Sequence, residues 1–272
     1  VTNKLYRLDH LRALAITFVF LYHYRIPIFV HPEWINDAAK FGWTGVDLFF
    51  VLSGFLISSQ LFSQIKQGNK VSLKEFFLKR FFRIIPAYWI VIAIYFLFPA
   101  FHEREALSPA WKYVTFTQNF GLDIKSNGTF SHAWSLCVEE HFYLLLPVIL
   151  ILLSFTKGLK QAYWLLIVLF IAGFFIRIYN WNYLFLPHIE DENVWLFWYK
   201  YIYYPTYNRL DGLLVGVSIA ALYNFLPNVW STISRYGNLL IVCALIVLTC
   251  AYFLCYEEHS YYATVYGFPL IA

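Results

Sequence analysis

Apolar stretches of about twenty residues, separated by shorter polar segments, recur from one end of the chain to the other. A helix needs this length to cross the hydrocarbon core of a bilayer, and a bundle of such helices satisfies its own backbone hydrogen bonds there. Charged residues make up 13% of the chain, whereas soluble domains average about 25%. The pattern therefore excludes an ordinary soluble globule and predicts an all-α, polytopic transmembrane helix bundle.

About eight spans are expected. They cover residues 11–30, 43–62, 84–101, 134–155, 162–179, 210–225, 239–255 and an incomplete one from 261. The chain has no Met and stops inside the last apolar run, so we expect residues 1–272 to be one membrane domain truncated at its C-terminus. The four cysteines lie in or beside apolar runs without the spacing of metal ligands. They are interpreted as packing thiols, and no metal site is expected.

The distribution of charge predicts the orientation. One side holds twelve cations, which are Lys4, Arg7, Arg12, Lys66, Lys70, Lys74, Lys79, Arg80, Arg83, Lys157, Lys160 and Arg235. The same side has only two acids, Asp9 and Glu75, whereas the opposite loops hold eight cations and ten acids. The positive-inside rule then predicts a multi-pass protein of the cell membrane with a cytoplasmic N-terminus. The lipid bilayer is an expected partner, and nucleic acid is not.

The first span carries two ionisable residues, Arg12 at its start and His23 deep inside it. They are eleven positions apart, which in an α-helix is three turns plus about 20°, so both face the same way about 16 Å apart. One elongated ligand can contact both. Ionisable side chains inside a membrane are costly and tend to serve a pathway, a relay or a catalytic site, although a satisfied packing histidine is the alternative.

Acidic residues lie inside two further spans. Asp47 is about one turn in from the outer face of the second span, where a carboxylate needs an arginine, a histidine or water. In the fourth span Ser135 and Glu139 share a helix face, and Glu140 lies about 100° round from Glu139. Glu140 and His23 are expected at similar depths in the bilayer. A carboxylate can therefore hold one ring nitrogen of His23 and leave the other as a base.

A cationic group precedes the apolar part of the third span. Arg80 and Arg83 are three residues apart and share a helix face at the cytoplasmic surface. Together with Lys79 and Arg12 they suit the phosphates of a cytosolic cofactor. The alternative is an ordinary positive-inside anchor.

Arg209 and Asp211 stand at the outer end of the sixth span. They are interpreted either as a pair that snorkels to the interface or as contacts to a polar acceptor such as a sugar. The aromatic run 195–207 next to them is interpreted as a belt at the membrane interface.

Taken in order, four of these motifs resemble the integral-membrane acyltransferase family 3, which includes acetylases of O-antigen, exopolysaccharide and nodulation factors. The motifs are Arg12 and His23 separated by ten residues, the run GVDLFFVLSGF from Gly45, Arg80-Phe-Phe-Arg83, and WSLCVEEHFY from Trp134. Cys137 stands where the family often has Ser. Each motif alone is weak, but their order over about residues 5–216 is specific.

The resemblance implies a membrane domain of roughly ten helices that moves an acyl group, usually acetyl, from cytosolic acyl-CoA to a carbohydrate hydroxyl. The co-substrate is then acetyl-CoA, and the acceptor a lipid-linked glycan, an O-antigen or an exopolysaccharide.

Specific roles follow from this resemblance. The CoA phosphates would rest on Arg12, Arg80 and Arg83, assisted by Lys79. His23 would deprotonate the acceptor or carry the acyl group itself, with Glu139 or Glu140 orienting its ring. The acceptor side would include Asp47, Ser135, Arg209 and Asp211.

A transporter or proton relay is the competing interpretation, because chains of His, Asp and Glu inside helices also build those proteins. The Arg80 and Arg83 pair and the lack of an inverted repeat in the sequence favour the enzyme.

Overall fold

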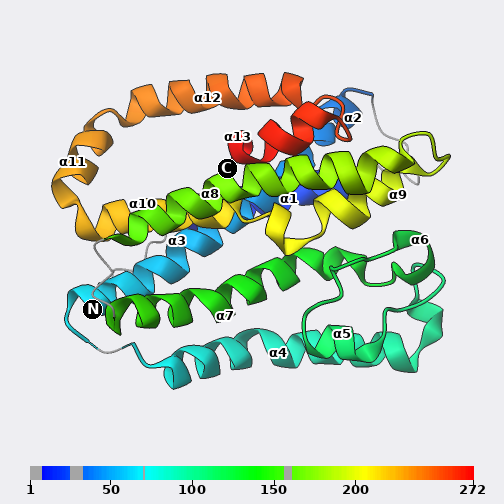
Figure 1. Ribbon diagram of the computed structural model, residues 1–272, viewed down its shortest axis with the longest axis horizontal. Helices are drawn as coiled ribbons and strands as arrows, with labels where there is room; N and C mark the ends of the chain where they lie inside the picture. Colours follow the sequence, from blue (N-terminus) through cyan, green and yellow to red (C-terminus); the bar gives the residue numbers. More distant parts are fainter. Residues whose placement is uncertain (1–7, 25–32, 70, 156–160) are drawn as a thin grey trace. The chain divides into compact units, whose positions relative to one another are not determined.

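The computed structural model describes residues 8–24, 33–69, 71–155 and 161–272, and all regular structure in these ranges is helical. The α-helices are α1 (Leu8–Tyr24), α2 (Glu33–Lys40), α3 (Gly45–Lys66), α4 (Leu73–Leu97), α5 (Ala110–Val114), α6 (Ile124–Asn127), α7 (Trp134–Phe155), α8 (Ala162–Asn180), α9 (Val194–Trp198), α10 (Asp211–Phe225), α11 (Pro227–Arg235), α12 (Gly237–Leu254) and α13 (Phe268–Ile271) (Figure 1). The predicted helical class is confirmed.

Five of the described helical segments are long and apolar enough to cross a membrane, or six if α10 and α11, bent by 109°, form one span. This is fewer than the eight predicted spans. The first predicted span runs on into residues 25–32, which lie outside the described residues, and α1 itself has only 17 residues. The segment after residue 261 is not one regular span, because the π-helical turn Ala263–Gly267 precedes the short α13.

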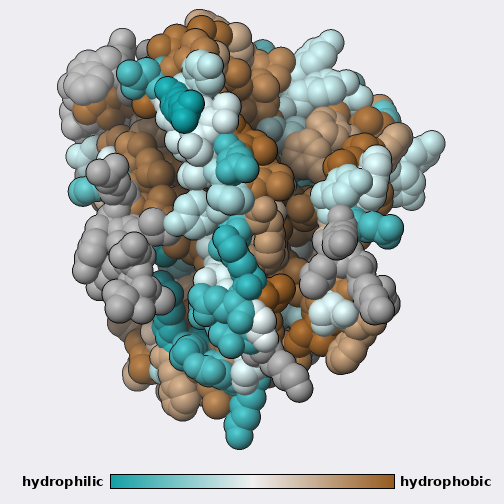
Figure 2. All heavy atoms as spheres, turned by 90° about the vertical axis from the view of Figure 1, so that its left-hand side faces the viewer, coloured by the Kyte–Doolittle hydropathy of each residue, from teal (hydrophilic) through white to brown (hydrophobic). Residues whose placement is uncertain are grey.

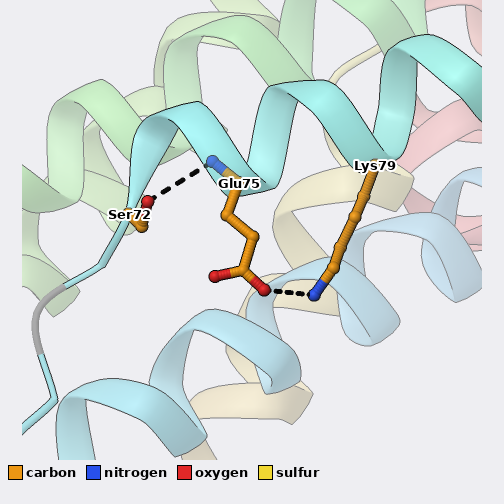
Figure 3. Close-up of polar contacts among 3 residues, drawn as sticks. All are labelled: Ser72, Glu75 and Lys79. Carbon is orange, nitrogen blue, oxygen red and sulfur yellow. Dashed lines mark hydrogen bonds and ion pairs between the residues drawn. The ribbon is translucent and has the colours of Figure 1, made fainter.

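Helix α4 begins eleven residues before the predicted start of the third span. Its first turn is capped by Ser72, whose hydroxyl accepts a hydrogen bond from the backbone N–H of Glu75 at 3.3 Å (Figure 3). A Ser followed three residues later by Glu is a capping pattern that starts a helix whether or not the residues are apolar. The predicted boundary was wrong because it followed hydropathy alone.

Many large apolar side chains are exposed, and brown, apolar areas are visible on the face drawn in Figure 2. Helix α12 has one buried residue, Ala251, and large exposed side chains such as Phe253 and Leu239. Such a surface suits contact with lipid rather than water. The interpretation of the cysteines as packing thiols holds for the buried Cys137 and Cys255 but not for the two that are exposed on α12, Cys243 and Cys250.

The chain divides into two compact units. The first consists of Val1–Phe62, Leu166–Phe174 and Leu210–Ala272, and the second of Ser63–Leu165 and Phe175–Arg209.

Glycines allow the helices of the first unit to approach closely. A Cβ added at Gly45 in α3 would lie 2.5 Å from the carbonyl oxygen of Ala15 in α1, and one at Gly54 would lie 2.3 Å from that of Leu213 in α10. Real Cβ atoms do not come this close to backbone oxygens. The prediction that Gly45 and Gly54 permit close helix packing is therefore confirmed.

The second unit has an aromatic core between α4, α5 and α7. Tyr88, Tyr113 and Phe130 are buried together with Ala133. The Tyr88 hydroxyl donates a hydrogen bond to the carbonyl oxygen of Tyr113 at 3.2 Å. This core fixes the long α4 against the start of α7.

The aromatic run 195–207 belongs mainly to the interior of the second unit. Trp198, Ile202, Tyr203 and Tyr204 are all buried, and the ring centroids of Trp198 and Tyr203 are 5.2 Å apart. The interpretation of this run as an interface belt was wrong for its middle, where the rings pack against one another, but Trp195 and Tyr207 at its two ends are exposed.

Candidate active site

His23 lies in the last turn of α1, and its ring has a defined protonation pattern. The Nδ1–H of His23 donates a hydrogen bond to the carbonyl oxygen of Val19, 2.8 Å away. Because a carbonyl can only accept, the hydrogen must be on Nδ1, and in the neutral ring Nε2 carries the lone pair. The side chain is exposed, so Nε2 is available to a ligand as a base. The sequence predicts this division of roles with a carboxylate as the holding group, whereas in the structure the carbonyl oxygen of Val19 holds Nδ1.

Arg12 stands near the opposite end of the same helix. Its guanidinium forms an ion pair with the carboxylate of Asp9 at 3.0 Å, and the Asp9 side chain is 62% exposed. An exposed pair of this kind contributes about 0–1 kcal/mol, so an anionic ligand can take the place of Asp9 at little cost. Helix α1 is continuous from Leu8 to Tyr24, as the predicted shared face of Arg12 and His23 requires.

Asp47 and Asp211 are both buried in the first unit, at 3% and 4% exposure. They lie where α3 meets α10, since a Cβ at Gly212 would be 3.0 Å from the backbone oxygen of Asp47. The structure thus brings two of the predicted acceptor residues to one helix contact. Both residues interact with other groups of the protein, and the arginine, histidine or water expected beside Asp47 stays a prediction.

The second unit brings together a cluster of Arg80 from α4 with Glu139, Glu140 and Tyr143 from α7, here called the α4–α7 cluster. The guanidinium of Arg80 lies 3.9 Å from the centroid of the Tyr143 ring. The Tyr143 hydroxyl donates to a carboxylate oxygen of Glu139 at 2.7 Å. Arg80 also interacts electrostatically with Glu140, whose Oε1 is buried without a hydrogen bond among the described residues. The two acids therefore differ in environment, as their positions around the helix predicted.

The other predicted cations of α4 remain at its surface. Lys79 is exposed and pairs with Glu75 at 2.5 Å (Figure 3), and Arg83 is exposed. Arg80 alone of these three is half-buried and turned onto α7. The pairing of His23 with Glu139 or Glu140 stays a prediction, because His23 belongs to the first unit and the glutamates to the second.

Arg209 is 1% exposed, so the interpretation of Arg209 and Asp211 as an interfacial snorkelling pair was wrong. The guanidinium of Arg209 lies 4.8 Å from the ring centroid of Tyr203 and 5.5 Å from that of Trp134. Cation–π contacts of this kind are strongest where water is excluded. Ser135, the residue after Trp134, is half-buried.

Sequence analysis missed a buried polar network in the second unit. Arg177 is fully buried and donates to the carbonyl oxygen of Asn208 at 3.2 Å, while Asn180 donates to the side-chain oxygen of Asn208 at 3.0 Å. Nearby, Thr206 is 2.8 Å from Nδ1 of His141 and accepts from Asn119 at 2.9 Å. An arginine and several asparagines within apolar runs were the available signal, because such residues need internal partners.

No group of three or more His, Cys, Asp or Glu side chains that could hold a metal ion occurs in the described ranges.

Comparison with known proteins shows the family of this chain. The model of acyltransferase family 3, described as an acyltransferase domain, matches residues 5–272. The chain belongs to acyltransferase family 3. The family assignment confirms the resemblance that the four ordered motifs predicted.

Other members of acyltransferase family 3 are similar over most of the chain. Peptidoglycan O-acetyltransferase OatA of Listeria monocytogenes is 31% identical over 235 residues, which cover 80% of this chain and 34% of that protein. O-acetyltransferase OatA of Staphylococcus aureus is also 31% identical over 235 residues, with 79% and 34% covered. A putative O-acetyltransferase of Staphylococcus aureus strain COL is 30% identical over 231 residues. The chain spans about a third of the length of these relatives. No solved structure matches it.

Proposed function

We propose that this chain is a membrane-embedded O-acyltransferase that moves an acyl group, in the simplest case acetyl, from cytosolic acyl-CoA to a hydroxyl of a cell-surface or exported carbohydrate. The observation that carries the proposal is the hydrogen bond from Nδ1 of His23 to Val19, which leaves Nε2 as a base in a member of an acyltransferase family. The names of the relatives indicate that the transferred group is acetyl. The name of the Listeria protein also indicates that its acceptor is peptidoglycan.

The proposed reaction uses Nε2 of His23 as the general base. Nε2 takes the proton of the acceptor hydroxyl while the hydroxyl oxygen attacks the thioester carbonyl carbon. The new C–O bond replaces the C–S bond, and the departing thiolate of CoA takes the proton from His23. Alternatively, Nε2 attacks the thioester carbonyl carbon itself, so that a C–N bond replaces the C–S bond and the CoA thiolate leaves. The acceptor oxygen then attacks the acyl-imidazole, a C–O bond replaces the C–N bond, and the hydroxyl proton passes to the thiolate. In either route the imidazole returns to its starting state.

Placement of the substrates follows the charge of the two sides. With the N-terminus in the cytoplasm, as the positive-inside rule predicts, Arg12, Arg80 and Arg83 lie on the side from which acyl-CoA arrives. Asp47, Ser135, Arg209 and Asp211 then belong to the acceptor side. The weak exposed pairs of Arg12 and Lys79 support this assignment, because phosphate oxygens can replace Asp9 and Glu75 at little cost.

The proposed function is tested by the release of free CoA thiol from acetyl-CoA by the purified protein in lipid nanodiscs. We expect protein-dependent thiol release that increases when a peptidoglycan fragment or another surface glycan is added, with O-acetyl groups appearing on the glycan. Solute or proton flux without thiol release would instead establish the transporter or relay.

Replacing Arg80 with alanine is expected to raise KM for acetyl-CoA by about tenfold or more, because one charge-assisted hydrogen bond is worth about 1.5–3 kcal/mol. KM for the glycan should change less. The measurement is steady-state thiol release with each substrate varied in turn.

Lys74→Ala is the matched control, since Lys74 is an exposed cation of the same helix outside the proposed site. Arg80→Lys keeps the positive charge but loses the planar guanidinium that stacks on the Tyr143 ring. Comparing Arg80→Lys with Arg80→Ala therefore separates the contribution of the charge to phosphate binding from the contribution of the stack to packing. A larger rise in the glycan KM than in the acetyl-CoA KM would refute the phosphate assignment.

A further inference from the structure

The His23 end of α1 is connected to a loop more than two hundred residues away in the sequence. The hydroxyl of Tyr22 donates a hydrogen bond to a carboxylate oxygen of Glu258 at 3.1 Å. Glu258 lies between α12 and the π-helical turn Ala263–Gly267, in the segment 255–260. Both side chains are half-buried, whereas His23 and Glu257 are exposed. The structure therefore selects one of two adjacent glutamates to contact α1.

The segment 255–260 is held in place by contacts on several sides. The ammonium group of Lys40, at the end of α2, lies 3.6 Å from the centroid of the Tyr256 ring. Cys255 is buried, and a Cβ at Gly267 would lie 2.5 Å from its sulfur. Contacts at Tyr256 and Cys255 thus hold the segment from which Glu258 reaches Tyr22.

Tyr22 is held from its other side by the turn Phe41–Thr44. A Cβ at Gly42 would lie 3.0 Å from the Cβ of Tyr22 and 2.3 Å from the carbonyl oxygen of Phe18. The backbone of α1 therefore packs directly on Gly42. With its Cβ fixed there and its hydroxyl bound to Glu258, the Tyr22 ring has a single orientation.

This ring contacts the imidazole. The centroids of Tyr22 and His23 are 5.6 Å apart and the rings meet edge to face at 84°, a geometry that aromatic pairs prefer. Two contacts thus orient the His23 ring, the hydrogen bond from Nδ1 to Val19 and the edge-to-face contact with Tyr22.

We propose that Glu258 is a positioning residue for His23, acting through Tyr22 to hold the imidazole in the orientation that proton transfer requires. The inference rests on the proposed function of His23. It adds to that function a residue from the connection between two predicted spans, 239–255 and the incomplete one from 261.

The test compares kcat and KM for acetyl transfer by the purified protein in nanodiscs, with acetyl-CoA as donor. Glu258→Ala and Tyr22→Phe should each lower kcat by about tenfold with KM for acetyl-CoA changed less than about twofold. The double variant should be no slower than either single variant, because the two residues act as one unit. Glu258→Gln keeps an acceptor oxygen for Tyr22 and should recover part of the rate.

Glu257→Ala is the matched control and should retain the wild-type kcat. The inference would be overturned if Glu258→Ala were as active as Glu257→Ala. It would also be overturned if the fold-loss of kcat in the double variant equalled the product of the two single fold-losses. If Glu258→Ala does not fold, the kcat of Tyr22→Phe alone tests the inference, because that substitution removes only one oxygen atom.

A second measurement separates this inference from the proposed function. Modification of His23 by diethyl pyrocarbonate, followed by mass spectrometry, reports on access to its ring nitrogens without any catalysis. Tyr22→Phe and Glu258→Ala should change the modification rate, and Glu257→Ala should not. If the wild type transfers no acetyl group, the proposed function fails. If the modification rate is the same in all variants, the positioning inference fails.

Discussion

Replacing His23 with alanine is expected to lower acetyl transfer by roughly 10²–10⁴-fold, the usual contribution of a positioned general base. The physical reason is that Nε2 is the lone pair left available once Nδ1 donates its hydrogen to Val19. The variant should insert into the membrane normally, because the exposed imidazole contributes little packing. The measurement is the initial rate of acetyl transfer to glycan, normalised to the amount of folded protein.

His10→Ala is the matched control, since His10 is an exposed histidine of the same helix outside the proposed site, and it should keep the wild-type rate. Incubation with labelled acetyl-CoA in the absence of acceptor separates the two roles of His23. Label retained on the wild type but not on His23→Ala would establish an acyl carrier, and no label would establish a base. A fully active His23→Ala variant would contradict the proposed mechanism.

Replacing Gly54 with alanine is expected to cost roughly 1–3 kcal/mol of stability through overpacking. The added Cβ would lie 2.3 Å from the backbone oxygen of Leu213, and a backbone cannot rotate out of the way as a side chain can. Helices α3 and α10 must then separate along their contact, which also carries Asp47 and Asp211. The measurement is Tm in detergent or nanodiscs, which should fall by about 2–4 °C for each kcal/mol lost.

Gly237→Ala is the control for this change, because a Cβ at Gly237 meets nothing within 4 Å. Its Tm should equal that of the wild type or exceed it slightly, since alanine favours a helix more than glycine does. Equal Tm values for the Gly54 and Gly237 variants would show that α3 and α10 do not depend on this contact.

Sequence patterns were sufficient for the helical class, most helix positions, and the close packing at Gly45 and Gly54. Long apolar runs have few alternatives to membrane-spanning helices, and α7 and α8 begin where the hydropathy predicted. Hydropathy failed at α4, where the capping by Ser72 extends the helix into charged residues. It also failed for the middle of the run 195–207, where Trp198, Tyr203 and Tyr204 are buried, because aromatic rings pack into a core as readily as they face an interface.

The partners of the ionisable residues were much less predictable. The acids Glu139 and Glu140 were recognised as out of place in an apolar helix, but the contact of Arg80 with Tyr143 was not foreseen. Arg177 and Asn208 were overlooked although both are fully buried. The stack of Arg80 on Tyr143 and the hydrogen bond of Arg177 to Asn208 each join two different segments. Helical spacing describes only neighbours on the same segment, such as Glu139 and Tyr143.

The sequence by itself determined that this chain forms a bundle of apolar helices, that Arg12 and His23 lie along one of them, and that it resembles acyltransferase family 3. Those properties depend on residue type and on spacing within single segments. Only the tertiary structure decided that Glu258 rather than Glu257 contacts Tyr22, and that Asp47 and Asp211 meet at one helix contact. Such choices depend on which segments pack together, and packing brings residues into contact across any distance in the sequence.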